Sequence, residues 1–335
     1  MPDRKGELVR LTPASTLIRT TGQAVQLSAE ETAAHQAVLA AATADNTRRT
    51  YQSAVRHFLG WGGRLPCTES DIIRYLLAHA ESLNTRTLAV RLAALGQWHS
   101  TQNFANPTTT PLIRKTMKGL KRLHGKPKAK ARALITSEMK VLIQELIEEE
   151  GLAARRDSAL LQLGLFGALR RSELAGLTED MLTWTTEGLQ ITLPRSKTDQ
   201  TGEGITKTIP FAAADSVCCP ARALRRWLDA ASISKGSPVF RSITRWGTLG
   251  TDALVPESIN VILEKRTRHA CLADQSNLSS HSLRRGLATS AHLAGVSLVD
   301  IMRQGGWRNA NTVMEYIEDA DAFKHNAAGQ LLMKG

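Results

Sequence analysis

The chain has 335 residues, of which 42% are hydrophobic and 22% charged, with a formal net charge of +12 and a pI near 9.9. This composition excludes a chain that is disordered throughout, and the length suffices for two or three domains with separate cores. The sequence contains no run of about 18 apolar residues, so we expect no membrane-spanning helix. We also expect no signal peptide at its start. We therefore expect a cytoplasmic protein whose polyanionic partner is nucleic acid in the nucleoid rather than a membrane surface.

Four cysteines lack the spacing of a zinc site and form no disulfide framework. We expect them to be reduced thiols that behave as small buried hydrophobic residues. They are Cys67, Cys218, Cys219 and Cys271.

The first part of the chain divides into a leader and a helical domain. Residues 1–29 lack sustained periodicity and are expected to be a flexible leader. Residues 30–123 show helical patterns, with a stripe of apolar side chains over Thr47–Trp61 and a helix start at Thr68. Little strand signal interrupts them, so we expect a small helical domain. Its helices carry the basic residues Arg48, Arg49, Arg56, Arg86 and Arg91.

A basic segment at 124–132 breaks the helical periodicity. It contains Gly125, Pro127 and five basic residues in nine positions, among them Lys126 and Lys128. Such a segment extends by charge repulsion and is expected to link two domains and lie along phosphates. A solvated surface loop is the alternative for each single lysine.

The second domain is expected at 133–335. Ser137 is expected to cap a first helix, and Asp157–Phe166 reads as an apolar helix. Alternating residues at 189–193 and 205–209 flank a glycine-containing turn, which predicts a β-hairpin with Lys197 near its tip. Later helices are expected to start near Pro220, Pro256, Ser282, Ser297 and Asn311.

The basic residues of this second domain suit chemistry on a phosphodiester. Nucleases that use magnesium hold it with clustered carboxylates, and no convincing cluster occurs in this sequence. Guanidinium groups are an alternative, because they stay charged and bind phosphate oxygens in pairs. Arg170 and Arg284 are our candidates for this clamp.

A tyrosine is the candidate nucleophile, since Tyr316 is the only tyrosine after residue 75. Attack by its hydroxyl would store the bond energy in a phosphotyrosyl link without ATP. His281 lies one helical turn before Arg284 and is the candidate base. Lys197 is the candidate acid for the leaving 5′ oxygen, and the indole N–H of Trp307 is a further donor. Each residue alone also has a structural interpretation: an exposed helix face, a solvated lysine or a core aromatic.

Taken in order, these motifs resemble the tyrosine recombinase family, also called phage-type integrases. The stretch Ala168–Leu174 fits an arginine box of the form L-R-x-S-E-L, and the register selects Arg170 rather than Arg171, with Glu173 in support. His281 and Arg284 fit a second box. A tryptophan at 307, within Ile301–Ile317, is similar to the Cre-like branch, because most members carry histidine there.

The resemblance implies a mainly α fold. It implies a helical core-binding domain and an α-rich catalytic domain with a small antiparallel β-hairpin, which together form a C-shaped DNA clamp. A C-terminal helix at about 321–332 would dock into a neighbouring protomer through Phe323, Leu331 and Leu332; the alternative is that it folds back on its own protomer. Near Pro256, an arginine of Cre-like members reads a base. Glu257 stands near that position here, so we assign base reading to Glu257 and Asn260.

The resemblance also implies the activity. Four protomers would synapse two inverted-repeat sites on double-stranded DNA and exchange strands through a Holliday junction, with no cofactor and no metal. The arginines of the helical domain would hold phosphates rather than bases. Two alternatives stay open: a type IB topoisomerase, which uses the same tyrosine chemistry without strand exchange, and a DNA-binding regulator with an inactive catalytic domain.

Overall fold

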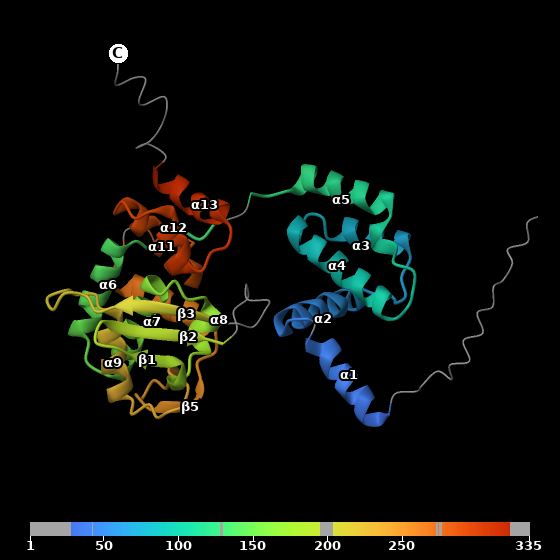
Figure 1. The fold of residues 1–335 in the computed structure, drawn as a ribbon. Helices are drawn as coiled ribbons and strands as arrows, with labels where there is room; N and C mark the ends of the chain where they lie inside the picture. Colours follow the sequence, from blue (N-terminus) through green and yellow to red (C-terminus); the bar gives the residue numbers. More distant parts are fainter. Residues whose placement is uncertain are drawn as a thin grey trace, which may run out of the picture. The chain divides into compact units, whose positions relative to one another are not determined.

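The chain divides into two compact units, Met1–Lys128 and Ala129–Gly335. The computed structural model describes residues 28–41, 43–127, 130–194, 204–272, 274 and 277–321. Helices dominate both units, and the β-structure is limited to small antiparallel sheets (Figure 1). The expected mainly α fold is confirmed.

The N-terminal unit consists of helices whose starts follow from local hydrogen bonds. Thr68 and Asp71 each accept the backbone N–H of the other, and the side chain of Asn84 accepts the N–H of Arg86. The elements are α1 (Ala29–Ala41), α2 (Asp45–Gly60), α3 (Glu69–Ala78), α4 (Thr85–Thr101), the 3-10 helix η1 (Pro107–Thr109) and α5 (Pro111–His124).

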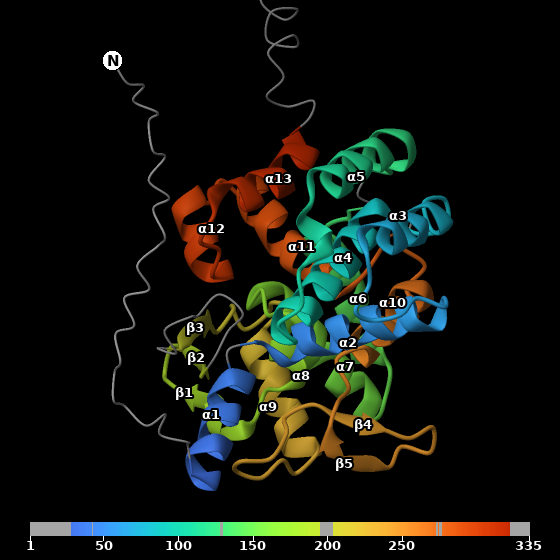
Figure 2. The same ribbon diagram turned by 90° about the vertical axis from the view of Figure 1, so that its right-hand side faces the viewer.

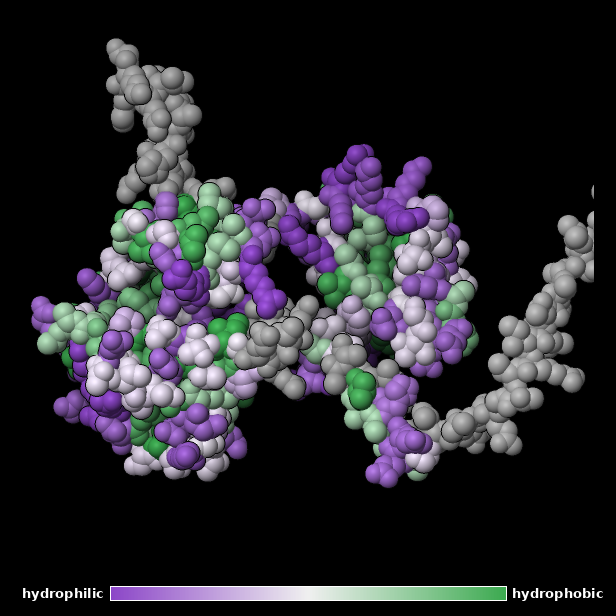
Figure 3. All heavy atoms as spheres, in the orientation of Figure 1, coloured by the Kyte–Doolittle hydropathy of each residue, from purple (hydrophilic) through white to green (hydrophobic). Residues whose placement is uncertain are grey.

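The core of this unit takes one face from each of α2, α3, α4 and α5. Phe58, Tyr75, Leu95 and Ile113 are all almost completely buried in it. Basic side chains occupy the outer face of α5, and hydrophilic residues gather over this helix in Figure 3. Its exposed basic residues are Arg114, Lys115, Lys118, Lys121 and Arg122.

The C-terminal unit is built around α7, which is buried on every side over most of its length. Its second half is mostly apolar, as expected of a core helix, its buried charges at Arg156 and Asp157 are paired, and α6, α9 and α11 pack against it. The helices are α6 (Thr136–Glu148), α7 (Leu152–Phe166), α8 (Arg171–Ala175), the 3-10 helix η2 (Glu179–Met181), α9 (Pro220–Ala230), α10 (Ser258–His269), α11 (Ser280–Leu293), α12 (Leu298–Gly305) and α13 (Ala310–Asp321).

Two small sheets complete this unit. The first has the order β1-β2-β3, and β2 and β3 form the hairpin predicted from the alternating pattern. Ile191 of β2 stands opposite Lys207 of β3. The second sheet, β4 with β5, was not predicted. The strands are β1 (Leu182–Trp184), β2 (Gly188–Leu193), β3 (Ile205–Pro210), β4 (Arg241–Ile243) and β5 (Leu249–Ala253).

Several helix starts differ from the expected ones by one or two residues. The first helix of this unit begins at Thr136, and the carboxylate of Glu138 accepts the N–H of Ile135, so Ser137 is not its cap. Helix α11 begins at Ser280 rather than Ser282, because Ser279 supplies the capping side chain.

A small bundle of three helices within the C-terminal unit carries the C-terminal motifs. Helices α11, α12 and α13 pack against one another (Figure 2) around a core that includes Ala288, Ile301, Val313 and Ile317. The expected docking helix at 321–332 lies outside the described residues except for Asp321, where α13 ends.

Two further expectations concern the membrane and the cysteines. None of the helices in the described part of the chain is long and apolar enough to cross a membrane. All four cysteines are free thiols. Three of them are buried as expected, but Cys271 is exposed, because it lies in the turn that follows α10.

Candidate active site

Helices α11 and α13 bring the candidate base and the candidate nucleophile together. The imidazole Nε2 of His281 lies 2.9 Å from the hydroxyl oxygen of Tyr316. Their ring centroids are 5.7 Å apart in an edge-on arrangement. His281 occupies the first turn of α11, where Ser279 accepts its backbone N–H. The capped helix start therefore fixes the position of the imidazole.

Tyr316 is only 6% exposed. The edge-on ring of Trp307 lies 6.0 Å from its ring, and the Arg285 guanidinium lies 4.8 Å from its ring centroid. Burial raises the pKa of the Tyr316 hydroxyl above its ordinary value, against the opposing charges of Arg284 and Arg285. The hydroxyl therefore remains protonated at neutral pH. Nucleophilic attack by its oxygen needs a nearby group that accepts this proton, and His281 lies within hydrogen-bond distance.

Arg284 lies one turn after His281 and is buried. Its guanidinium donates to the backbone carbonyl of Ala168 and, at 3.1 Å, to that of Gly305. It also stands over the Trp307 ring, 4.9 Å from the centroid. Burial, and then the nearby charge of Arg170, lower the pKa of Arg284 to about 10. The group is still charged at neutral pH, and two backbone carbonyls hold it in place.

Arg170 approaches from the turn between α7 and α8. Glu173 accepts its backbone N–H and its guanidinium, both at 2.7 Å. The Glu173 carboxylate is 7% exposed, whereas the Arg170 side chain is 23% exposed. The buried carboxylate thus orients the arginine and leaves part of its guanidinium accessible. Ala168 has a φ of 45° in this turn, a conformation that L-residues adopt rarely.

Trp307 follows a tight turn at the end of α12. Gly306 has a φ of 65°, which glycine adopts without strain, and the N–H of Trp307 donates to Met302. A Cβ on Gly305 would lie 1.9 Å from the indole ring. The pair Gly305-Gly306 therefore lets the indole fold back over Arg284.

Sequence reasoning missed one residue of this site, Lys207 of β3. Its side chain is almost completely buried, and its Nζ donates to the backbone carbonyl of Gln304 at 2.7 Å. The pKa of Lys207 is lowered to about 8, chiefly by burial and to a smaller extent by the charge of Arg284; the charge of Glu173 acts in the opposite direction. Lys207 shares an inward strand face with Ile205 and Ile209, and a lysine between two isoleucines was the available signal.

Two predicted site residues, Glu257 and Asn260, do not join this cluster, and two more lie outside the described part of the chain. Lys197, the candidate acid, and Lys128 lie outside the described residues. Glu257 forms an exposed ion pair with Arg171 at 3.3 Å. The side chain of Asn260 accepts the N–H of Ser280 at 2.8 Å, so it supports the start of α11.

The basic residues expected to hold phosphates lie on the N-terminal unit. Arg48 pairs with Asp45 in its own helix, and Arg91 donates to the hydroxyl of Tyr75 at 2.8 Å. These two are engaged within the unit. The other four are exposed: Arg49, Arg56, Arg86 and Lys126.

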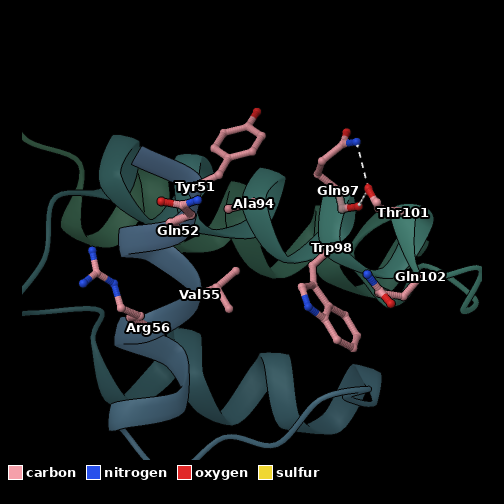
Figure 4. Close-up of a pocket in the computed structure, with 9 residues that line it drawn as sticks. All are labelled: Tyr51, Gln52, Val55, Arg56, Ala94, Gln97, Trp98, Thr101 and Gln102. Carbon is pink, nitrogen blue, oxygen red and sulfur yellow. Dashed lines mark hydrogen bonds between the residues drawn. The ribbon is translucent and has the colours of Figure 1, made fainter. Parts of the chain in front are cut away.

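An apolar groove of about 580 Å³ lies between α2 and α4 of the N-terminal unit. Figure 4 shows Val55 of α2 and Trp98 of α4 side by side, with Arg56 at one end. Its lining holds a tyrosine, Tyr51, but no histidine, lysine or carboxylate beside it that could act as an acid or a base. The chemistry-bearing residues are instead those of the C-terminal unit. Among the described residues of both units, no three histidine, cysteine or acidic side chains are grouped as metal ligands would be.

The model of the phage integrase family matches residues 132–322, more than half of the chain. The chain belongs to the phage integrase family. This confirms the resemblance that the arginine boxes, Trp307 and Tyr316 indicated, and the match includes all of the catalytic candidates.

Curated relatives agree with this membership. An integrase/recombinase of Selenomonas ruminantium, a XerD homologue, is 35% identical over 299 residues, which cover 87% of this chain and 86% of the relative. The Cre recombinase of Escherichia phage P1 is 24% identical over 273 residues, 77% of this chain and 78% of the relative.

Solved structures share the fold of this phage integrase family member. The Tn1549 transposon integrase in complex with transposon right end DNA superposes with a TM-score of 0.56 at 16% identity, covering 90% of this chain and 96% of that chain. A λ integrase dimer bound to a COC′ core site has a TM-score of 0.59 at 15% identity, covering 88% and 77%.

Proposed function

We propose that this phage integrase is a site-specific DNA recombinase in which Tyr316 attacks a DNA phosphate and forms a 3′-phosphotyrosyl intermediate. The observation that carries the proposal is the 2.9 Å contact between His281 and Tyr316 beside the buried guanidinium of Arg284. A nucleophile within hydrogen-bond reach of a base that is itself held in place is the arrangement required for covalent catalysis.

The proposed step conserves atoms and charge. A bond forms between the Tyr316 oxygen and phosphorus, and the bond between phosphorus and the 5′ oxygen breaks. His281 accepts the phenolic proton, and Lys197 donates a proton to the departing 5′ oxygen. Religation by another 5′ hydroxyl reverses the step, so no ATP is consumed.

Arg170 and Arg284 are proposed to stabilise the transition state. Each guanidinium would bind non-bridging oxygens of the phosphate as negative charge develops on them. Glu173 and the carbonyls of Ala168 and Gly305 already orient these donors. Such preorganised cations need no metal ion at the same phosphate, so we propose a metal-independent reaction.

Double-stranded DNA with an inverted-repeat site is the proposed partner. The net charge of +12 and the exposed basic face of α5 favour a polyanion. We propose that the N-terminal unit binds DNA as one arm of a clamp, through phosphate contacts of Arg49, Arg56, Arg86 and Lys126. The logarithm of the binding constant would then fall with the logarithm of salt concentration, with a slope of about −0.9 per phosphate contact.

Recombination further requires that protomers assemble. We propose a homotetramer on two sites, joined through the segment at about 321–332, and strand exchange through a Holliday junction. Analytical ultracentrifugation of the DNA complex should show a tetramer for the full chain. A chain truncated after Asp321 should bind DNA without forming it, and an unchanged tetramer would remove this segment from the assembly.

Trapping of the covalent intermediate tests the central proposal. Selection from a randomised DNA pool gives the site, and a duplex of that site nicked close to the cleavage position prevents religation. The wild type should form a covalent adduct in the presence of EDTA, and Tyr316→Phe should form none. An adduct with Tyr316→Phe would show another nucleophile, and its loss in EDTA would show a metal requirement.

The products of an intact substrate separate the proposal from topoisomerase activity. A supercoiled plasmid with two sites should yield recombinant circles. Relaxed plasmid without recombinants would instead identify a type IB topoisomerase. DNA binding without any adduct would identify an inactive regulator.

A modified DNA substrate tests the role of proton donor that we propose for Lys197. Lys197→Ala should cleave normal DNA slowly but recover most of its rate on a 5′-bridging phosphorothiolate, whose sulfur leaves without a proton. If the modified substrate gives no recovery, Lys197 is not the acid.

A further inference from the structure

Lys207 is a buried lysine in the wall of the proposed active site. It lies in β3 opposite Ile191 and is 5% exposed. Of the lysines in the described part of the chain, only Lys207 is buried. Burial of an ammonium group is unfavourable unless hydrogen bonds or opposite charges compensate for it. Apolar packing alone therefore does not explain why a lysine stands beside Ile209 on the buried face of β3.

Within the described residues, the Lys207 ammonium donates to the carbonyl of Gln304, at 2.7 Å. The charged groups that face it are mainly cationic: Arg284 from α11 and Arg170 from the turn before α8, with Glu173 as the opposing acid. Two arginines and a lysine around one carboxylate leave a surplus of positive charge. A phosphate is the kind of group that would balance it.

The contact with Gln304 also determines the position of Trp307. Gln304 and Gly305 are consecutive residues, and their carbonyls accept from Lys207 and Arg284 respectively. The Gln304 side chain donates to the carbonyl of Phe166 at 2.9 Å. Two buried cations, Lys207 and Arg284, thus donate to the carbonyls of two successive residues in the turn that carries the indole.

We propose that Lys207 is a positioning residue of the recombinase site, whose ammonium fixes the turn from Gln304 to Trp307 and supplies a third positive charge to the phosphate pocket. This inference rests on the proposed function. It assigns Lys207 a role different from that of Lys197, because Lys207 would act on Trp307 and on the electrostatic potential rather than on the leaving oxygen.

The acidity of the ammonium supports this role. The pKa of Lys207, lowered to about 8 by burial and by Arg284, leaves the group charged at neutral pH and neutral at higher pH. The value of kcat/KM reports ionisations in the free enzyme. Adduct formation at limiting enzyme should therefore decrease as the pH rises through about 8.

Single-turnover adduct formation on the nicked substrate tests the inference. Lys207→Met gives an unbranched side chain that is one atom shorter and uncharged, and it should slow adduct formation by about 10²-fold. Lys207→Arg stays charged, so it should retain more activity and should not show the decrease above pH 8. Lys140→Met, at an exposed lysine of α6, is the matched control and should behave as the wild type.

Two results would overturn the inference. One is a Lys207→Met protein with the rate and pH profile of the wild type. The other is recovery of Lys207→Met on the 5′-bridging phosphorothiolate, which would make Lys207 a proton donor instead. If Lys207→Met does not fold, the pH profile of Lys207→Arg decides, because a persisting decrease above pH 8 excludes Lys207 as its origin.

The measurements also distinguish this inference from the proposed function. If the wild type forms no adduct, or Tyr316→Phe forms one, the proposed function fails. If the wild type forms an adduct that depends on Tyr316 and Lys207→Met is unaffected, only the role of Lys207 fails.

Discussion

The imidazole Nε2 of His281 and the hydroxyl oxygen of Tyr316 lie 2.9 Å apart, although the two residues are 35 positions apart in the sequence. Helices α11 and α13 create this contact by packing against each other. Because burial raises the pKa of the Tyr316 hydroxyl, the phenol remains protonated until a base accepts the proton. His281 is the group placed to do so.

Removal of this base should slow cleavage strongly. His281→Ala should reduce the single-turnover rate of adduct formation by about 10²–10⁴-fold, the usual contribution of a positioned acid or base. His269→Ala, at the exposed end of α10, should leave the rate unchanged. Equal rates for both variants would assign proton acceptance to another group.

The choice of Arg170 over Arg171 gives a second prediction. Arg170→Lys keeps one charge but loses the planar donors that Glu173 orients, so we expect a loss of about 10²–10³-fold in rate. Arg171→Lys alters only an exposed pair with Glu257 and should cost less than about threefold. A reversed order of the two effects in adduct assays would show that the register of the motif is wrong.

The sequence was sufficient to propose His281, Arg284 and Tyr316 as candidates, because the spacing of the first two on one helix and the scarcity of tyrosine constrain the choice. The structure brings these three side chains together. It was not sufficient to predict what surrounds them. Lys207 enters the site because β3 directs alternate side chains inward, and strand pairing over a long sequence separation decides what lies opposite.

DNA contacts of exposed side chains are hard to predict from sequence for a related reason. An exposed polar residue on a helix start has no local signal that separates a DNA contact from an intramolecular one. Asn260 accepts the N–H of Ser280, and Glu257 pairs with Arg171. Both contacts depend on how α10 packs against other elements of the unit, which helical periodicity does not determine.

The hairpin of β4 and β5 was not predicted because its strands are short.

A buried ion network should contribute strongly to the stability of the C-terminal unit. Asp157 is 3% exposed and accepts from Arg156 at 2.9 Å and from Arg266 at 2.7 Å. Asp157→Asn leaves two buried guanidinium groups with less compensation, so the free energy of unfolding should fall by about 3–5 kcal/mol. Glu264→Gln, in an exposed pair with Arg268, should change it by less than about 1 kcal/mol. Denaturant unfolding measures both, and similar values would contradict the assigned role of the network.

The N-terminal unit should lose stability on acidification. Burial, and then the charge of Arg91, lower the pKa of both His57 and His79 below 6.5. A histidine with a lowered pKa binds fewer protons when folded, so its contribution is complete above 6.5 and is lost as the pH falls through the folded value.

Urea unfolding near neutral pH and at about pH 5.5 measures this loss. The double variant His57→Gln with His79→Gln should be less sensitive to acid than the wild type. His124→Gln, at the end of α5 and outside this cluster, should keep the sensitivity of the wild type. Equal acid sensitivity of the double variant would show that the two histidines are not its source.

The turn before Trp307 gives a prediction about geometry alone. In Gly305→Ala, the new Cβ would lie 1.9 Å from the indole, so the ring must move away from Arg284, over which it stands at 4.9 Å. A displacement of about 1 Å at a catalytic site can cost about 10² in rate, and we expect a loss of this order in adduct formation. Gly119→Ala, where no atom lies within 4 Å of the new Cβ, should have no effect on the rate.

Trp307→Ala removes the ring with which the new methyl group collides. If Gly305→Ala acts through the indole, its effect in the Trp307→Ala background should largely disappear, because the two changes remove the same interaction and are not additive. If the two losses instead multiply, Gly305→Ala acts on the backbone. The carbonyl of Gly305, which accepts from Arg284, would then be the group that transmits the change to the phosphate pocket.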